Sequence, residues 1–193
     1  MSSNKKKSVF REWLEAALVA AFFAFCIIRP FVIQAFKIPT GSMRPTLLEG
    51  DLILVNKFIY GAKVPFTKMR LTGFRAPARG DVIVFIYPED TKKDFIKRLV
   101  GLPNETVEIK SGTIYINDKP LLDPAFNKRY YYNRGVFMSE GEKITVPEDS
   151  YFVLGDNSGS SKDSRYWGFV PKDNVLGVAV AIYWPPLRIR AIK

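Results

Sequence analysis

Histidine is absent from this chain of 193 residues, and cysteine occurs once, as Cys26. A Ser-His-Asp triad, a Cys-His pair and an H-E-x-x-H zinc site all need an imidazole, so the sequence excludes these sites within the chain. One cysteine also excludes an intramolecular disulfide and a cluster of cysteine metal ligands. Acid–base chemistry near neutral pH must therefore come from carboxylates, lysine, tyrosine or an added cofactor.

Acidic residues are also scarce, with 19 Asp and Glu against 29 Lys and Arg, which gives a net charge of +10. A charge of this sign suggests an anionic partner, either nucleic acid or a lipid headgroup surface. The N-terminus favours lipid, because Lys5, Lys6 and Lys7 precede the thirteen uninterrupted apolar residues Ala16–Ile28. No P-loop or dinucleotide-binding motif is present. We therefore expect contact with anionic membrane lipid and not with nucleic acid.

The apolar run fits three kinds of segment: a cleaved signal peptide, a buried core helix or a membrane anchor. No convincing small-x-small cleavage site follows it, and it carries no polar stripe, which favours the anchor. Counting back to Val9 reaches the roughly 20 residues that a spanning helix needs. We predict a cytoplasmic tail over residues 1–8 and a single transmembrane helix over 9–30. The lysines before the span then place residues 31–193 outside the cytoplasm.

The rest of the chain has the composition of β structure. Runs of β-branched and aromatic residues are separated by Gly, Pro, Asn and Asp, which is typical of strands and turns. These runs are Leu52–Tyr60, Asp81–Tyr87, Phe95–Val100, Tyr151–Leu154 and Val175–Trp184. Residues 106–117 predict a hairpin around the two-residue loop Ser111-Gly112. We therefore predict one mainly β domain over 31–193, a sandwich or barrel of coiled sheets.

One short segment, Ile38–Thr46, has features that suit a nucleophile. Ser42 follows Gly41, which lets the backbone turn sharply, and it precedes the apolar Met43. A sharp turn can present a serine hydroxyl with backbone N–H donors nearby. The same residues also suit an ordinary turn, and a serine nucleophile needs a base that here cannot be histidine.

Lysine is the available substitute for that base, provided that burial lowers its pKa. Lys97 lies in the predicted strand Phe95–Val100, and strand alternation places Phe95 and Leu99 on the same face. Apolar neighbours of this kind desolvate an ammonium group. The pattern also fits a lysine on an edge strand whose head lies in water.

Four blocks of sequence, in this order behind the apolar segment, resemble the bacterial type I signal peptidases, and the short chain resembles their compact Gram-positive type. The blocks are Gly41–Thr46, Arg79–Phe85, Lys97–Pro103 and Gly155–Gly168. That family consists of membrane-bound Ser/Lys endopeptidases that release secretory signal peptides. The resemblance implies a single-pass protein of the bacterial cell membrane with its catalytic domain outside.

The resemblance also implies roles for individual residues. Ser42 resembles the nucleophile, and Lys97 resembles the general base. Ser161 resembles the hydroxyl that positions the lysine amine. Thr40 and the Ser42 backbone N–H resemble the donors of the oxyanion hole. Many relatives carry serine at the position of Thr40, but either hydroxyl can donate a hydrogen bond.

Further residues are implied to support the site or to bind substrate. Asp163 and Arg165 resemble a supporting ion pair. Small apolar pockets for alanine-like side chains are implied for Phe36, Ile38, Met43, Leu47 and Ile96. Asn104 stands where glycine is common in the family. Because Asn tolerates positive φ, we expect a turn there without loss of activity.

The implied reaction is acyl transfer through an acyl-enzyme, after small-x-small (Ala-x-Ala-like) sites, with no metal and no other cofactor. The expected partners are secretory precursor proteins, close to the secretion translocon. Two other classes stay open. One is an anchored β-domain that binds anionic lipid or polymer through the basic residues between 57 and 79. The other is a LexA-like Ser/Lys self-cleaving protein, which would need a DNA-binding module.

Overall fold

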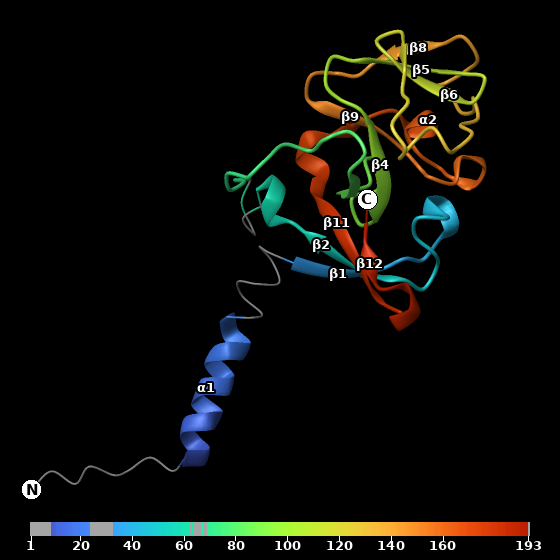
Figure 1. Ribbon diagram of the computed structural model, residues 1–193. Coiled ribbons are helices and arrows are strands. Elements are labelled where there is room, and N and C mark those ends of the chain that lie inside the picture. Colours follow the sequence, from blue (N-terminus) through green and yellow to red (C-terminus); the bar gives the residue numbers. More distant parts are fainter. Residues whose placement is uncertain (1–8, 24–32, 62, 64–66, 68, 193) are drawn as a thin grey trace, which may run out of the picture.

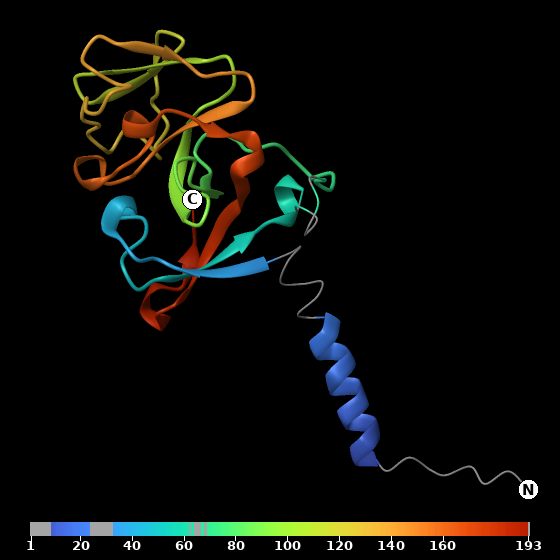
Figure 2. The same cartoon turned by 180° about the vertical axis from the view of Figure 1, so that it is seen from behind.

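The computed structural model describes residues 9–23, 33–61, 63, 67 and 69–192. Two β-sheets form the body of the molecule, and the helix α1 (Val9–Phe23) projects from it (Figures 1 and 2). The eight-stranded sheet has the order β1-β2-β11-β3-β4-β9-β10, with β12 beside β11. The four-stranded sheet has the order β7-β6-β5-β8. The predicted mainly β fold is therefore confirmed.

The large sheet is built from segments far apart in the sequence. Its strands are β1 (Ile33–Lys37), β2 (Leu52–Asn56), β3 (Val82–Ile86), β4 (Asp94–Gly101), β9 (Ser150–Leu154), β10 (Val170–Pro171), β11 (Val175–Trp184) and β12 (Arg190–Ala191). All of its pairings are antiparallel. The register shifts twice where β11 meets β2 and once where β4 meets β9, and such bulges bend strands and curl a sheet.

The small sheet continues the chain after β4. Its strands are β5 (Thr106–Lys110), β6 (Thr113–Ile116), β7 (Lys119–Pro120) and β8 (Lys143–Thr145). Ser111 and Gly112 join β5 to β6 with φ angles of 47° and 80°, so the predicted two-residue hairpin is confirmed. Asn104 has a φ of 65°, as expected for the turn that it occupies.

Short helical turns connect the strands. They are η2 (Gly41–Met43), η3 (Phe58–Tyr60), η4 (Ser158–Ser160), α2 (Ser164–Trp167), η5 (Lys172–Asn174) and η6 (Pro186–Arg188). The predicted strand Leu52–Tyr60 is thus shorter than expected, because η3 replaces its last residues.

Burial on both faces explains why the middle of the large sheet is apolar without interruption. In β3, Ile83 and Phe85 pack into one core cluster, whereas Val82 and Val84 pack into another. A third cluster lies between the small sheet and β9, where Val107, Phe152 and Leu154 are fully buried. The run Asp81–Tyr87 therefore behaves as a strand buried on both sides.

The helix α1 contains fifteen residues, and none of them is buried. Within the described ranges, no helix combines the length and the apolar character needed to cross a membrane. The predicted tail over 1–8 and the part of the predicted span over 24–30 lie outside the described residues.

Candidate active site

The turn η2 and the strand β4 meet at the site that the sequence indicates. Ser42 lies in η2, between β1 and β2, and Lys97 lies in the middle of β4. The Lys97 Nζ atom is 2.8 Å from the Ser42 Oγ atom, although 55 residues separate the two along the chain. Ser42 is 8% exposed and Lys97 is 4% exposed. A hydroxyl and an amine thus contact each other almost out of reach of bulk water.

Burial changes the acidity of Lys97. It lowers the pKa of the amine from 10.5 to about 8, while the charges of Asp163 and Asp156 act in the opposite direction. Nζ also donates a hydrogen bond to the Ile96 carbonyl, at 2.9 Å. Because Lys97 is buried and its Nζ contacts Ser42, the alternative in which the lysine head lies in water is wrong. A large fraction of this lysine is therefore neutral at mildly alkaline pH.

The apolar neighbours of Lys97 are those that strand alternation predicts. Phe95 and Leu99 both pack into the core cluster on one side of the large sheet. The Phe95 ring stacks on Tyr87, and its centroid is 5.4 Å from Lys97 Nζ. These aromatic groups provide the desolvation that lowers the pKa of the amine.

The turn that carries Ser42 is held by the segment after β9. The Asn157 backbone N–H donates to the Ser42 carbonyl, and its side-chain amide donates to the Gly41 carbonyl, each at 3.0 Å. A β-carbon at Gly155 would collide with Ser161 Oγ and with the Ser42 carbonyl oxygen, so this close approach requires glycine. The sequence did not indicate the role of Asn157, and its only signal was its place in the block Gly155–Gly168.

Two hydroxyl groups expected at the site differ in their surroundings. Ser161 is 6% exposed, and its Oγ has no hydrogen-bond partner among the described residues. The hydrogen bond expected between Ser161 and the Lys97 amine is therefore not formed in this structure. Thr40 is exposed and extended, and its side chain makes no capping hydrogen bond with η2. The Thr40 hydroxyl therefore makes no hydrogen bond that caps η2.

Asp163 and Arg165 form the ion pair that the resemblance implies, and both are fully buried. Arg165 Nε donates to one carboxylate oxygen at 2.7 Å, and an Nη donates to the other at 2.8 Å. Arg165 also donates to Ser158 Oγ and to the Ser158 carbonyl, and Asp163 accepts from the Gly155 N–H. The pair therefore fixes the loop that carries Ser161 and Asn157.

A second buried ion pair lies on the opposite face of β4, and the sequence did not indicate it. Arg98 is 1% exposed and forms a bidentate contact with Asp156, with distances of 2.8 and 2.7 Å. Arg129 donates to the same carboxylate at 3.1 Å, and the Thr46 hydroxyl also donates to it. Neighbouring residues of one strand thus place the Lys97 amine on one side and the paired Arg98 guanidinium on the other.

A small cavity of about 40 Å³ is lined by the end of β1 and by the residues of β4 that precede Lys97. Phe36, Ile38 and Ile96 line it, as the resemblance implies, together with Ile53 and Val84. Two other expected pocket residues do not line this cavity. Met43 and Leu47 are 0% exposed and lie in the adjoining core cluster, which also contains Ile38 and Val84 of the cavity lining. They support the wall of the cavity and do not form it.

The basic residues between 57 and 79 do not form one solvated face. Arg75 pairs with Asp81, and Arg79 pairs with Glu105, with closest distances of 2.7 and 2.6 Å. The Arg70 guanidinium donates to the Gly61 and Val175 carbonyls. Lys68 lies outside the described residues. Several of these cations therefore have structural contacts inside the fold.

Comparison with known proteins assigns the chain to a class of peptidases. A family model described as "Signal peptidase, peptidase S26" matches residues 10–184. The chain belongs to this family of serine endopeptidases.

Its relatives are bacterial signal peptidases I. The signal peptidase I of Buchnera aphidicola subsp. Schizaphis graminum is 35% identical, over 98% of this chain and 82% of the relative. That of Leptolyngbya laminosa is 40% identical, over 84% of this chain and 74% of the relative. A crystal structure of a signal peptidase I from Enterococcus faecalis is 39% identical, covers 54% of this chain and 97% of its own, and gives a TM-score of 0.43.

Proposed function

We propose that this chain cleaves signal peptides from secreted precursor proteins, with Ser42 as the nucleophile and Lys97 as the general base. The 2.8 Å contact between Lys97 Nζ and Ser42 Oγ inside a buried site is the observation that carries this proposal. The neutral amine accepts the Ser42 proton while Oγ attacks the peptide carbonyl. The protonated amine then gives this proton to the leaving nitrogen, so the peptide C–N bond breaks, the new N-terminus departs and an acyl-enzyme remains. The same lysine then activates the water that hydrolyses the acyl-enzyme.

The developing oxyanion needs donors near Ser42. The exposed Thr40 hydroxyl is not used by the turn, which supports a role as one donor, and the Ser42 backbone N–H is the other in this proposal. Ser161 completes the site by orienting the lysine amine. Its buried Oγ has no partner in the described structure, so a hydrogen bond with a rotated amine would satisfy it.

The small cavity lined by Phe36, Ile38 and Ile96 supports a preference for small side chains before the cleaved bond. A cavity of about 40 Å³ has room for a methyl group but not for a large apolar side chain. The strand β1 lies at the edge of the large sheet, and β9 begins to pair with β4 only at Arg98. An extended substrate can therefore add to these strand edges by backbone hydrogen bonds and place small side chains in the cavity.

Membrane anchoring is part of the same proposal. The apolar run Ala16–Ile28 in the sequence and the unburied helix α1 support an anchor over residues 9–30. The lysines before it favour a cytoplasmic tail over 1–8 and an extracytoplasmic catalytic domain over 31–193. This arrangement keeps Ser42 close to anionic lipid, to the translocon and to the emerging cleavage site of a precursor.

The dyad is tested by single and double substitutions in the detergent-solubilised full chain. Ser42→Ala and Lys97→Ala should each reduce cleavage of a precursor with an Ala-x-Ala site by at least about 10³-fold. The double variant should lose little more, because the two groups act as a unit. N-terminal sequencing of the product identifies the bond that is cut. Losses that multiply in the double variant would contradict a dyad.

Matched controls separate catalysis from folding. The exposed residues Ser139 and Lys162 provide Ser139→Ala and Lys162→Ala, which should retain full activity. In the wild type, kcat/KM should rise with pH and reach a plateau above about 8, since protonated Lys97 cannot act as a base. Activity that still rises at pH 10 without a plateau would mean that Lys97 is an ordinary solvated lysine.

A further inference from the structure

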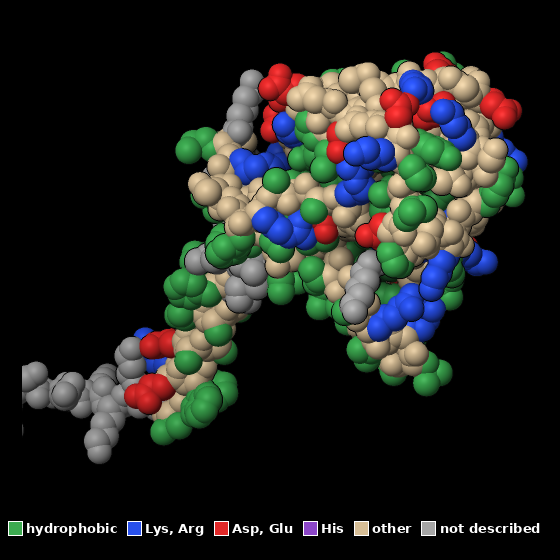
Figure 3. All heavy atoms as spheres, turned by 45° about the horizontal axis from the view of Figure 1, so that its top comes forward, with side chains coloured by type: hydrophobic (Ala, Val, Ile, Leu, Met, Phe, Trp, Pro, Cys, Tyr) green, Lys and Arg blue, Asp and Glu red, His purple; other side chains and the backbone are tan. Residues whose placement is uncertain are grey.

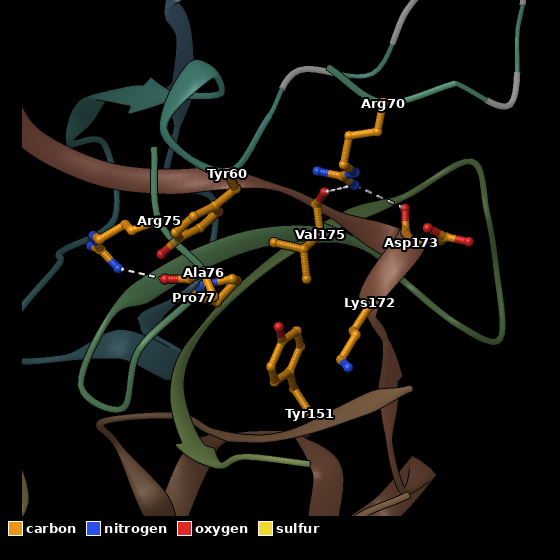
Figure 4. Close-up of a pocket in the computed structure, with 9 residues that line it drawn as sticks. All are labelled: Tyr60, Arg70, Arg75, Ala76, Pro77, Tyr151, Lys172, Asp173 and Val175. Atoms are coloured by element: carbon orange, nitrogen blue, oxygen red, sulfur yellow. Dashed lines mark hydrogen bonds between the residues drawn. The ribbon is translucent and has the colours of Figure 1, made fainter. Parts of the chain in front are cut away.

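A second cavity, of about 250 Å³, lies on a different part of the molecule from the dyad. It is lined by residues between Arg70 and Pro77, by Tyr151 of β9, by Lys172 of η5 and by Val175 at the start of β11 (Figure 4). None of its lining residues belongs to the small substrate cavity. The peptidase mechanism uses none of them.

The hydroxyl of a largely buried tyrosine points into this cavity. Tyr151 as a whole is 5% exposed, but its hydroxyl oxygen is not among the buried, unpartnered side-chain atoms of the described residues, so it is open to the cavity. Figure 4 shows the ring of Tyr151 standing on β9 with its oxygen directed toward the middle of the cavity. Burial raises the pKa of this hydroxyl, so it remains a neutral O–H donor at physiological pH. A donor that is open to a cavity can be offered to a ligand that accepts hydrogen bonds.

Two cations of the cavity, Arg70 and Lys172, lack a close ion pair among the described residues, although the charge of Asp173 acts on Arg70. Arg70 donates to the backbone carbonyls of Gly61 and Val175 and, at 3.4 Å, to the backbone carbonyl of Asp173. Lys172 Nζ lies 4.0 Å from a carboxylate oxygen of Asp149, at the limit of an ion pair, and that carboxylate side chain is 95% exposed.

The other charged groups on the lining balance each other or lie apart from the hydroxyl. Arg75 is bidentate to Asp81, with distances of 2.7 and 2.9 Å. Asp173 contacts Arg70 through its backbone carbonyl. Figure 4 shows the Lys172 side chain extending toward the Tyr151 ring. The described lining therefore presents one hydroxyl donor and two cations to whatever enters the cavity, together with the Asp173 carboxylate, whose charge acts on Arg70.

We infer that this cavity binds a phosphate group, either free or in the headgroup of an anionic phospholipid. A tetrahedral oxyanion accepts hydrogen bonds from several directions, which suits Tyr151, Lys172 and Arg70 approaching from three separate segments. The volume is several times the roughly 30 Å³ of one water molecule, so a phosphate and an attached group fit. Ala76 and Pro77 offer an apolar wall to the attached group. This inference does not depend on the proposed peptidase function, because binding is measured without cleavage.

The experiment measures binding to the detergent-solubilised full chain by calorimetry and by the rise in Tm. The probes are inorganic phosphate, and dihexanoyl phosphatidylglycerol and dihexanoyl phosphatidylcholine as monomers. We expect phosphate and phosphatidylglycerol to bind, and phosphatidylcholine to bind less tightly because its quaternary ammonium meets Arg70 and Lys172. Tyr151→Phe and Lys172→Gln should each weaken binding about tenfold, the effect of one lost hydrogen bond to a charged group.

The matched controls are Tyr183→Phe and Lys128→Gln, which alter exposed residues away from the cavity and should leave binding unchanged. Tighter binding of phosphatidylglycerol than of inorganic phosphate identifies a lipid headgroup as the source of the phosphate. The reverse order identifies free phosphate, and either order supports the site. Absence of binding by the wild type would overturn the inference. Equal binding by the wild type and both cavity variants would overturn it as well.

Discussion

At the scale of single residues, burial of Lys97 has two opposite effects. It lowers the free energy of unfolding, and it makes the amine neutral enough for its proposed role as a base. The folded chain lowers the pKa of Lys97 from 10.5 to about 8, so the unfolded chain binds this proton more tightly. Below pH 8 the cost to folding is present in full, and it disappears as pH rises toward 10.5. A difference of this size corresponds to about 3 kcal/mol in the free energy of unfolding.

Replacing this lysine by an apolar side chain of similar length should therefore stabilise the protein. We expect Lys97→Met to raise the free energy of unfolding at pH 7 by about 1–3 kcal/mol, since the charge no longer has to be buried. The gain should shrink between pH 8 and 10.5. Urea unfolding at a series of pH values measures both effects.

The control for this prediction is Lys162→Met, because Lys162 is an exposed lysine in the loop that carries Ser161. It should change the free energy of unfolding by less than about 0.5 kcal/mol at every pH. If Lys97→Met were no more stable than the wild type at pH 7, the Lys97 amine would be hydrated in the folded chain.

At the scale of elements, β4 serves two purposes through its alternation. Its Lys97 side chain contacts Ser42 on one side, while Arg98 pairs with Asp156 on the other. The neighbouring strand β9 leads directly into the loop that holds the serine turn. Any movement of this loop would therefore disturb the buried ion pair and the nucleophile together.

The buried pair on β4 gives the next prediction. Asp156→Asn should lower the free energy of unfolding by about 3–5 kcal/mol, because Arg98 and Arg129 would keep their charges without a carboxylate. Asp118→Asn is the matched control, since Asp118 also pairs with a cation, Lys143, but is 68% exposed. It should cost less than about 1 kcal/mol. Equal effects in urea unfolding would contradict a special role for the buried pair.

Local patterns predicted much of the fold and part of the site. Strand alternation predicted that Lys97 shares a face of its strand with Phe95 and Leu99, and the Ser111-Gly112 loop predicted the hairpin between β5 and β6. Both predictions succeeded because they depend on residues close in sequence. The buried pair between Arg98 and Asp156 spans 58 residues and left no local signal. Met43 was expected in a pocket, but the direction of a side chain in a short turn depends on distant strands.

At the scale of the whole molecule, an apolar helix without buried contacts stands beside a basic body. The helix α1 exposes Phe10, Trp13, Leu18 and Phe22, each by more than 60%. Figure 3 shows green side chains along this helix and blue side chains on parts of the body that face the viewer. An exposed apolar surface of this kind indicates a membrane or a partner. The proposed membrane anchor would account for both the exposed helix and the net charge of +10.

The last prediction tests this anchor. Two arginines introduced as Leu18→Arg with Phe22→Arg should release the chain from membranes, because each charge near the middle of a span costs about 2.5–3.5 kcal/mol. The same number of arginines placed on the body, as Leu122→Arg with Val136→Arg, should leave it bound, since both positions are already exposed. Flotation with phospholipid vesicles measures the bound fraction. Cleavage of a precursor held in vesicles should fall with release, whereas cleavage of a short soluble peptide should stay unchanged. Equal flotation of the two double variants would mean that the body alone holds the protein at the membrane.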